Sequence, residues 1–381
     1  MQEILRATSF RVALNMNLSD IRSGLRRWRG ATIGVWLLAG SLCGQEPPGG
    51  PPKRELGPGP WDNDVLVHRI DAGGAREKLA TFDRAGVASV ARMADGRLLA
   101  AFQHFPKDDP RRFDRVAVRF SGDEGRNWSP AETILIAGFP AGMTRPFDPT
   151  LVPLPDGRIR LYFTSNTSRD FRRSPPMIHS AVTTNGVDYV FEPGVRFSVE
   201  GRIVIDCAVA LHEGVFHLVV PDNGSVDEFP QGPGAGPPPN SRGGYHAVST
   251  DGLKFERLTD LTLDSSRNRW LGCLVSDAGR LLFFGTGPGP WPIASQDGAS
   301  WNALKETVRF PGADPGAVRL KDGSWLVVAT GAPQGRGDFR GGRRGGPEPG
   351  KPKDREDGPR APSQGRPRGA EHGDDTATTG R

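Results

Sequence analysis

Three aspartates could carry acid–base chemistry in this chain, because they recur at one position of a repeated pattern. They are Asp148 in FDPTLV, Asp206 in IDCAVAL and Asp314 in ADPGAV, and each stands eight or nine residues before a turn glycine. Strand formation does not explain an acid at this place, since Asp is depleted in strands. If the fold brings the carboxyls together, their like charges push the pKa values apart, so that one carboxyl holds a proton while a neighbour stays ionised.

The elements that would position these aspartates form a tandem repeat. A turn followed by an apolar strand recurs five times, as ADGRLLAAF, PDGRIRLYF, HEGVFHLVV, DAGRLLFFG and KDGSWLVVA. Asp-Gly or its equivalent between two β-type runs is a strong hairpin signal, and another short strand precedes each turn. Units of about four short strands without an amphipathic helix are typical of propeller blades. The repeat predicts an all-β fold, a five-bladed β-propeller of four-stranded antiparallel blades, with the three aspartates facing its central depression.

The fifth unit needs strands from elsewhere in the chain. It contains only two strands, in 314–330, before the apolar residues end. An incomplete blade would leave unpaired strand edges. We therefore expect the strand-like stretch DVLVHRI, Asp64–Ile70, to complete the fifth blade and close the ring.

A second motif recurs at the far end of the units. SGDEGRNW, Ser121–Trp128, is followed by shortened versions at 183 (TTNGVDY), 249 (STDGLKF) and 295 (SQDGASW). In such a turn the carboxylate and hydroxyl bind backbone groups of the turn itself, and glycine supplies a positive φ. We expect Asp123, Asp251 and Asp297 to stabilise turns and to take no part in chemistry.

Two family resemblances follow from these motifs. SGDEGRNW resembles the Asp-box, or BNR repeat, of sialidase-like propellers, which implies a six-bladed ring as the alternative architecture. FDPTLVPLPDGRIRLYF resembles the first-blade signature of five-bladed arabinanase, β-xylosidase and invertase-type glycosidases. This second resemblance implies that Asp148 is the base or nucleophile and that Asp206 orients and tunes it. Asp314 is the third carboxylate, at the same position of the repeat. Arg145 is similar to the arginine of an RDP-type motif at a different spacing, which implies substrate binding.

Together these features predict a carbohydrate-active enzyme that hydrolyses O-glycosyl bonds of an oligosaccharide or polysaccharide, as a sialidase-like or other exo-glycosidase. The alternative is a non-catalytic glycan-binding or protein-interaction propeller, because the strand that would carry the family's acid glutamate reads NRWLGCLVS. Sialidases use a Tyr nucleophile. Tyr162, Tyr189 and Tyr245 stand at strand or turn-aromatic positions and are poor candidates for that role.

The charge distribution excludes nucleic acid as a partner. The chain has 381 residues and a formal net charge of +5, but 1–45 carry six Arg against two acids, and 332–381 carry nine Arg and two Lys against eight acids. The part between them is mildly acidic, so a basic nucleic-acid surface is not expected. The seven His show no metal-ligand spacing, and we expect no cofactor beyond an optional structural cation or water cluster in the central channel.

Composition also predicts the domain organisation. Arginines precede the apolar run Ala31–Leu42, which is too short to span a bilayer but suits a signal peptide. We expect a signal peptide in 1–44, a Pro/Gly-rich linker in 45–60, the propeller in 61–331 and a disordered Arg/Gly/Pro-rich tail in 332–381. The protein is then a secreted or periplasmic monomer, held at a membrane only if the N-terminal segment is not cleaved.

Overall fold

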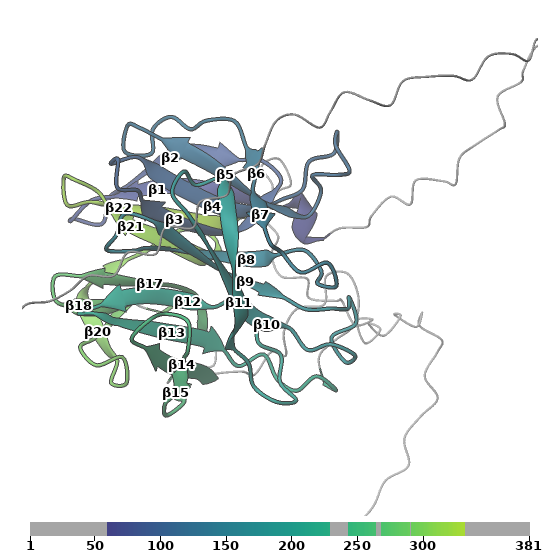
Figure 1. Ribbon diagram of the computed structural model, residues 1–381. Coiled ribbons are helices and arrows are strands. Elements are labelled where there is room, and N and C mark those ends of the chain that lie inside the picture. Colours follow the sequence, from purple (N-terminus) through teal and green to yellow (C-terminus); the bar gives the residue numbers. More distant parts are fainter. Residues whose placement is uncertain (1–58, 229–242, 264–267, 290, 332–381) are drawn as a thin grey trace, which may run out of the picture. The chain divides into compact units, whose positions relative to one another are not determined.

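The computed structural model describes residues 59–228, 243–263, 268–289 and 291–331 (Figure 1). The predicted signal peptide, nearly all of the linker and the tail lie outside these residues. Apart from a 3-10 turn at Pro60–Asp62, the regular structure in the described ranges consists of β-strands. None of the described helices is long and apolar enough to cross a membrane.

The strands form five sheets, which are the five predicted blades. Blade one contains β3 (Ala85–Arg92), β4 (Leu98–His104), β5 (Arg115–Ser121) and β6 (Glu132–Thr133). Blade two contains β8 (Phe147–Pro153), β9 (Ile159–Ser165), β10 (Met177–Thr183), β11 (Asp188–Phe197) and an added outer strand, β7 (Leu135–Ala137). Blade three contains β12 (Ala208–His212), β13 (Val215–Pro221) and β14 (Gly243–Ser249), with the short strands β15 (Glu256–Arg257) and β16 (Leu261–Thr262) both paired to β14.

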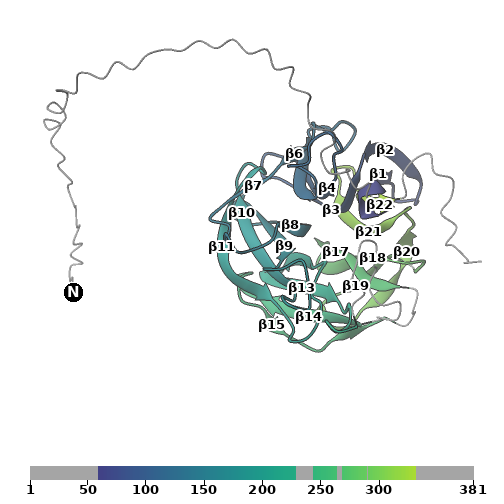
Figure 2. The ribbon, with the colours of Figure 1, turned by 90° about the vertical axis from the view of Figure 1, so that its right-hand side faces the viewer.

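The last two blades are four-stranded. Blade four contains β17 (Arg269–Asp277), β18 (Arg280–Thr286), β19 (Trp291–Ser295) and β20 (Asn302–Val308). Blade five contains β21 (Ala313–Arg319), β22 (Trp325–Gly331), β1 (Asp64–Ile70) and β2 (Arg76–Phe82). Contacts join each innermost strand to the next around the ring, in the order β3, β8, β12, β17, β21 and back to β3. Figure 2 shows β8, β17 and β21 toward the centre, with β2, β11 and β15 at the rim.

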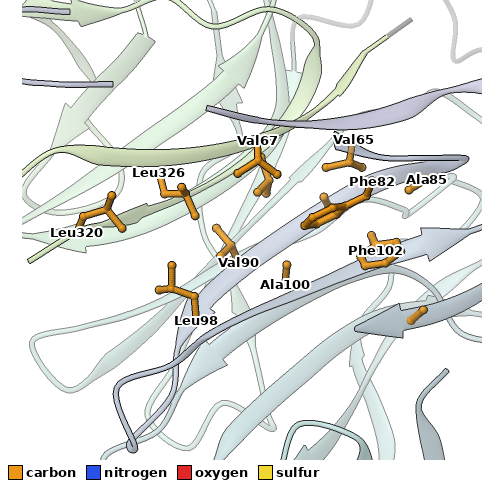
Figure 3. Close-up of a cluster of buried hydrophobic side chains, with 13 residues drawn as sticks. Val65, Val67, Phe82, Ala85, Val90, Leu98, Ala100, Phe102, Leu320 and Leu326 are labelled. Atoms are coloured by element: carbon orange, nitrogen blue, oxygen red, sulfur yellow. The ribbon is translucent and has the colours of Figure 1, made fainter. Parts of the chain in front are cut away.

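The ring closes as the sequence predicts. β1 pairs antiparallel with β22, with Val67 opposite Val328, and β2 adds the outer strand. Val67 and Phe82 of this blade are buried against Phe102 of blade one and Leu326 (Figure 3). Since the fifth blade is completed by the N-terminal strands, the six-bladed alternative is wrong.

The recurring Ser/Asp turns bond within themselves. Ser121 Oγ donates to Asp123 Oδ1 at 2.9 Å, and the Asn127 N–H donates to the same oxygen at 2.9 Å. Gly125 has φ +88, and Trp128 Nε1 donates to its carbonyl at 2.9 Å. The carboxylates of the turns at 249 and 295 accept hydrogen bonds in the same way. The carboxylates of Asp123, Asp251 and Asp297 therefore stabilise their own turns.

Candidate functional site

A small cavity lies where the innermost strands meet, and the three predicted aspartates line it. We call it the axial cavity; its lining residues are Val87, Ala88, Ser89, Asp148, Pro149, Thr150, Asp206, Cys207, Gly272, Cys273, Asp314 and Pro315. All five blades contribute to this lining. The cavity volume is about 20 Å³, which is room for about one water molecule.

Local backbone geometry explains why the carboxyls point inward. Asp148, Asp206 and Asp314 have φ of +52°, +61° and +49°, in the left-handed region. The innermost strands of blades two and five shift register around Asp148 and Asp314. A bulge of this kind redirects a side chain, and Asp is among the residues that tolerate the left-handed conformation.

Blades one and four have a similar irregularity at the equivalent position, but the residue there is not an acid. Val87 of blade one has φ +48°, which is a strained conformation for a β-branched residue. In blade four, Gly272 has φ +153°, and a Cβ there would lie 2.0 Å from the Phe284 carbonyl oxygen. Only glycine fits at this point, so blade four cannot place a side chain there.

Hydroxyl groups from the preceding blade hold two of the bulges. The Asp314 N–H donates to Thr286 Oγ1 at 2.7 Å, and the Val87 N–H donates to Thr330 Oγ1 at 2.9 Å. Such contacts between blades keep strained residues in place, and strain of this type clusters at functional sites.

Asp148 and Asp206 share a hydrogen bond, and their pKa values are both raised. Burial is the main reason that the pKa of Asp148 lies well above its ordinary range, and the charges of Asp206 and Asp314 raise it further. Burial also raises the pKa of Asp206, to about 6, while the hydrogen bond from Asp148 and the charge of Arg269 oppose the rise. Near neutral pH, the pair therefore shares one proton.

Asp314 is the third carboxyl of the cavity. Burial raises its pKa well above the ordinary range, and the charge of Asp206 adds to the effect. Among the three carboxyls, the ionised form is therefore least unfavourable at Asp206. Arg269, which supplies the opposing positive charge, is held by a hydrogen bond of 3.0 Å from its Nη2 to Asn223 Oδ1.

Arg145 is not part of this lining. Its guanidinium forms an ion pair with Asp114, which also accepts a hydrogen bond of 2.6 Å from Gln103 Nε2. Arg145 lines a second, larger cavity between blades one and two. Its predicted role in binding substrate stays a prediction.

From the sequence, Arg269 is one of several arginines that could bind an anion or lie at the surface, and Cys207 and Cys273 are expected to be free buried thiols. The sequence prediction places none of them beside the aspartates. Cys207 and Cys273 are free cysteines that line the cavity, and burial raises the pKa of both thiols. Their positions beside Asp206 and Gly272 in neighbouring blades could have signalled this. Arg269 begins an innermost strand, but no local pattern separates it from a surface arginine.

The tyrosines lie away from the cavity lining. Tyr162 and Tyr189 are fully buried, and the Tyr162 hydroxyl donates to the Gly252 carbonyl at 2.8 Å. Tyr245 bonds through its hydroxyl to Arg202 at 3.0 Å. Burial raises the pKa of Tyr162 and Tyr189 far above the range in which a phenolate forms near neutral pH. None of the three is available as a nucleophile beside the aspartates.

Within the described ranges, no group of three or more His, Cys, Asp or Glu is arranged to hold a metal ion. The His217 and His246 rings stack, with Nδ1 and Nε2 3.2 Å apart, inside blade three. The optional cation or water in the channel stays a prediction, and the axial cavity has room for a water.

Comparisons with known proteins give distant structural relatives. No family model matches the chain, and no curated protein matches its sequence. A GH32 β-fructofuranosidase from Bombyx mori is 14% identical over 64% of this chain and 54% of its own, with a TM-score of 0.44, so this chain spans about half of that enzyme's length. A GH43 enzyme from Xanthomonas citri, solved with xylotriose, is 15% identical over 64% and 80%, with a TM-score of 0.46.

A third structure belongs to a different activity. An N-acetylgalactosamine deacetylase from F. plautii, solved with blood group B trisaccharide, is 12% identical over 71% of this chain and 86% of its own, with a TM-score of 0.45. At these identities and scores, similarity assigns no activity to this chain. The case for function rests on the axial cavity.

Proposed function

We propose that the protein is a carbohydrate-active propeller that hydrolyses glycosidic bonds through the aspartates of the axial cavity. The observation that supports this most is that three carboxyls from three blades line one cavity, with one proton held between two of them. Carboxyls with separated pKa values are what acid–base catalysis of glycoside hydrolysis requires.

In this proposal, Asp148 and Asp206 act as one proton-holding unit. When the shared proton lies on Asp206, the Asp148 carboxylate is ionised and can act as the base or nucleophile. Asp206 then orients Asp148 and stores its proton, while Asp314 supplies the third carboxyl. Because the pKa of Asp206 is about 6, the pair becomes doubly protonated below that pH. We expect kcat/KM to fall as the pH falls through this region.

A sialidase-like subtype has less support, since no tyrosine lines the axial cavity among the described residues. We favour another exo-acting glycosidase, secreted through the predicted N-terminal signal.

A non-catalytic, glycan-binding propeller is the second candidate, and two observations favour it. The axial cavity takes about one water molecule, and Asp148 and Asp206 lie at hydrogen-bond distance. The two catalytic carboxyls of a glycosidase normally stand roughly 5–10 Å apart across the sugar. If the protein is an enzyme, Asp148 and Asp206 therefore occupy one side of the bond, and the proton donor to the leaving group lies elsewhere.

A screen of fluorogenic glycosides with the wild-type protein and Asp148→Asn tests the proposal. We expect hydrolysis of at least one glycoside and a loss of about 10²-fold or more in the variant. Asp156→Asn, which changes an exposed aspartate in a hairpin turn, is the matched control and should keep full activity. Equal activity in Asp148→Asn and wild type would remove Asp148 from the mechanism. Binding on a glycan array without turnover of any glycoside would favour the second candidate.

A further inference from the structure

A second cavity, much larger than the axial one, lies between blades one and two. Its volume is about 390 Å³, within the range of small-molecule sites. It is bounded by β5 and β6 of blade one and by the segment that runs from β7 to β8. Figure 2 shows β6 and β7 next to each other at the rim, with β8 nearer the centre. We call this cavity the arginine groove, after Arg111, Arg115 and Arg145 in its lining.

The side chains that line the groove are either basic or uncharged. Three arginines line it, and its lining contains no Asp or Glu. The Arg115 side chain is exposed and makes no hydrogen bond or ion pair with any described residue. The Arg111 side chain is 93% exposed and reaches only Asp109, at 3.4 Å. Arg145 is paired with Asp114, so Arg115 is the arginine of the groove that has no acidic partner among the described residues, and Arg111 has only its exposed contact with Asp109.

The rest of the lining is mostly apolar. Ile136, Phe139 and Met143 are half-buried, and the Leu135 side chain next to them is 64% exposed. Sugar rings place their C–H faces against surfaces of this kind, while a carboxylate or sulfate is gripped by the guanidinium fork. A neutral apolar ligand would leave Arg115 without a partner.

The groove lies near the aspartates. Arg145, which lines it, is three residues before Asp148, and three residues span at most about 10 Å. The charge of Asp148 also acts on Arg145, raising its pKa against the effect of burial.

We propose that the arginine groove binds acidic sugar units, with Arg111 and Arg115 on their carboxylate or sulfate groups, and that the natural ligand is an acidic oligosaccharide. As a statement about substrate, this rests on the proposed glycosidase function. The binding itself depends only on the groove.

Calorimetric titration of the full chain carrying Asp148→Asn tests the proposal, because that change prevents turnover without altering the groove. The probes are trigalacturonate, a sulfated chondroitin tetrasaccharide and the neutral cellotriose. We expect one or both acidic probes to bind, more weakly at high salt, and cellotriose to bind far less. The two acidic arms tell whether carboxylate or sulfate is preferred.

Variants at Arg115 and Arg111 identify the site. Adding Arg115→Gln should weaken acidic-probe binding about tenfold, with a further loss on adding Arg111→Gln. Arg158→Gln, which removes an arginine from a hairpin turn where its side chain is 43% exposed, is the matched control and should leave binding unchanged. An unchanged melting temperature in each variant shows that folding is intact. No binding of either acidic probe, or the same affinity in Arg115→Gln as in the control, overturns the proposal.

The two proposals fail separately. Hydrolysis of neutral glycosides without binding of an acidic probe counts against the groove and leaves the glycosidase standing. Binding of an acidic probe at Arg115, without hydrolysis of any glycoside by the wild-type protein, counts against the glycosidase and leaves the groove standing.

Discussion

The three aspartates of the axial cavity are unfavourable for folding in two ways, through their backbone conformation and through their burial. Asp148, Asp206 and Asp314 adopt left-handed backbone conformations, and burial makes their ionised forms costly. A packed propeller gains nothing from three such acids, whereas a site that binds or transfers protons needs them. The position of the aspartates was predictable because the turn glycines give a register for counting back. Their proton sharing was not, since it depends on distances between blades.

The raised pKa of Asp314 predicts a pH-dependent gain in stability for Asp314→Asn. The folded protein holds this proton more tightly than the unfolded chain, so wild-type stability is complete below the unfolded pKa and is lost as the pH rises through the folded pKa. We expect the variant to be more stable than wild type at pH 7, by on the order of 1 kcal/mol, and the difference to shrink toward pH 4. Urea unfolding at both pH values measures it.

Asp156→Asn is the control for this prediction. Asp156 is exposed, and hydrogen bonds from Arg158 lower its pKa, so the sign of its effect is opposite. A difference between wild type and Asp314→Asn that is the same at pH 4 and pH 7 would contradict the burial argument.

At the scale of elements, the aspartates of the repeated turns differ in role from those of the axial cavity. Asp123 and Asp314 are both aspartates of the same repeat, but Asp123 accepts hydrogen bonds from its own turn, which lower its pKa, whereas burial raises that of Asp314. Asx-type turns are local, so the structural role of Asp123 could be predicted from eight residues of sequence. The extra strand β7 could not, because its partner β11 lies about fifty residues further along the chain.

Asp123→Ala should destabilise the protein by about 1 kcal/mol without changing any glycosidase activity. The change removes the acceptor for the Asn127 N–H, the Asn127 side chain and the Ser121 hydroxyl. Thermal unfolding together with an activity assay measures both effects. Asp123→Asn keeps an acceptor oxygen and should lose less. A loss of activity at a melting temperature equal to wild type would mean that this turn does more than support the blade.

At the scale of the whole molecule, closure of the ring is the feature with the largest energetic weight. β1 and β2 bury Val65, Val67, Ile70 and Phe82 in the fifth blade and its neighbours. At about 1.5–3 kcal/mol for each buried side chain, their sum is comparable with the entire stability of a typical domain. The N-terminal strands are therefore required for the propeller as a whole.

Deleting residues 1–83 should abolish cooperative unfolding and cause aggregation, because β22 becomes an unpaired edge strand. Deleting residues 1–58, which leaves β1 and β2 in place, is the control and should unfold like the full chain. Circular dichroism melts and size-exclusion chromatography distinguish the two. A soluble, cooperatively folded product from the longer deletion would show that the ring tolerates an open blade.

The sequence alone determined the number of blades, the strand that closes the ring and the position of the three aspartates. Each of these follows from turn chemistry and strand periodicity, which act over a few residues and repeat along the chain. Only the tertiary structure decided that Asp148 shares its proton with Asp206, that Arg269 supports the Asp206 charge, and that the axial cavity holds about one water. It also showed that Arg145 does not line that cavity but pairs with Asp114 and lines the arginine groove. These features join segments of different blades, so their distances are set only when the blades pack around the axis.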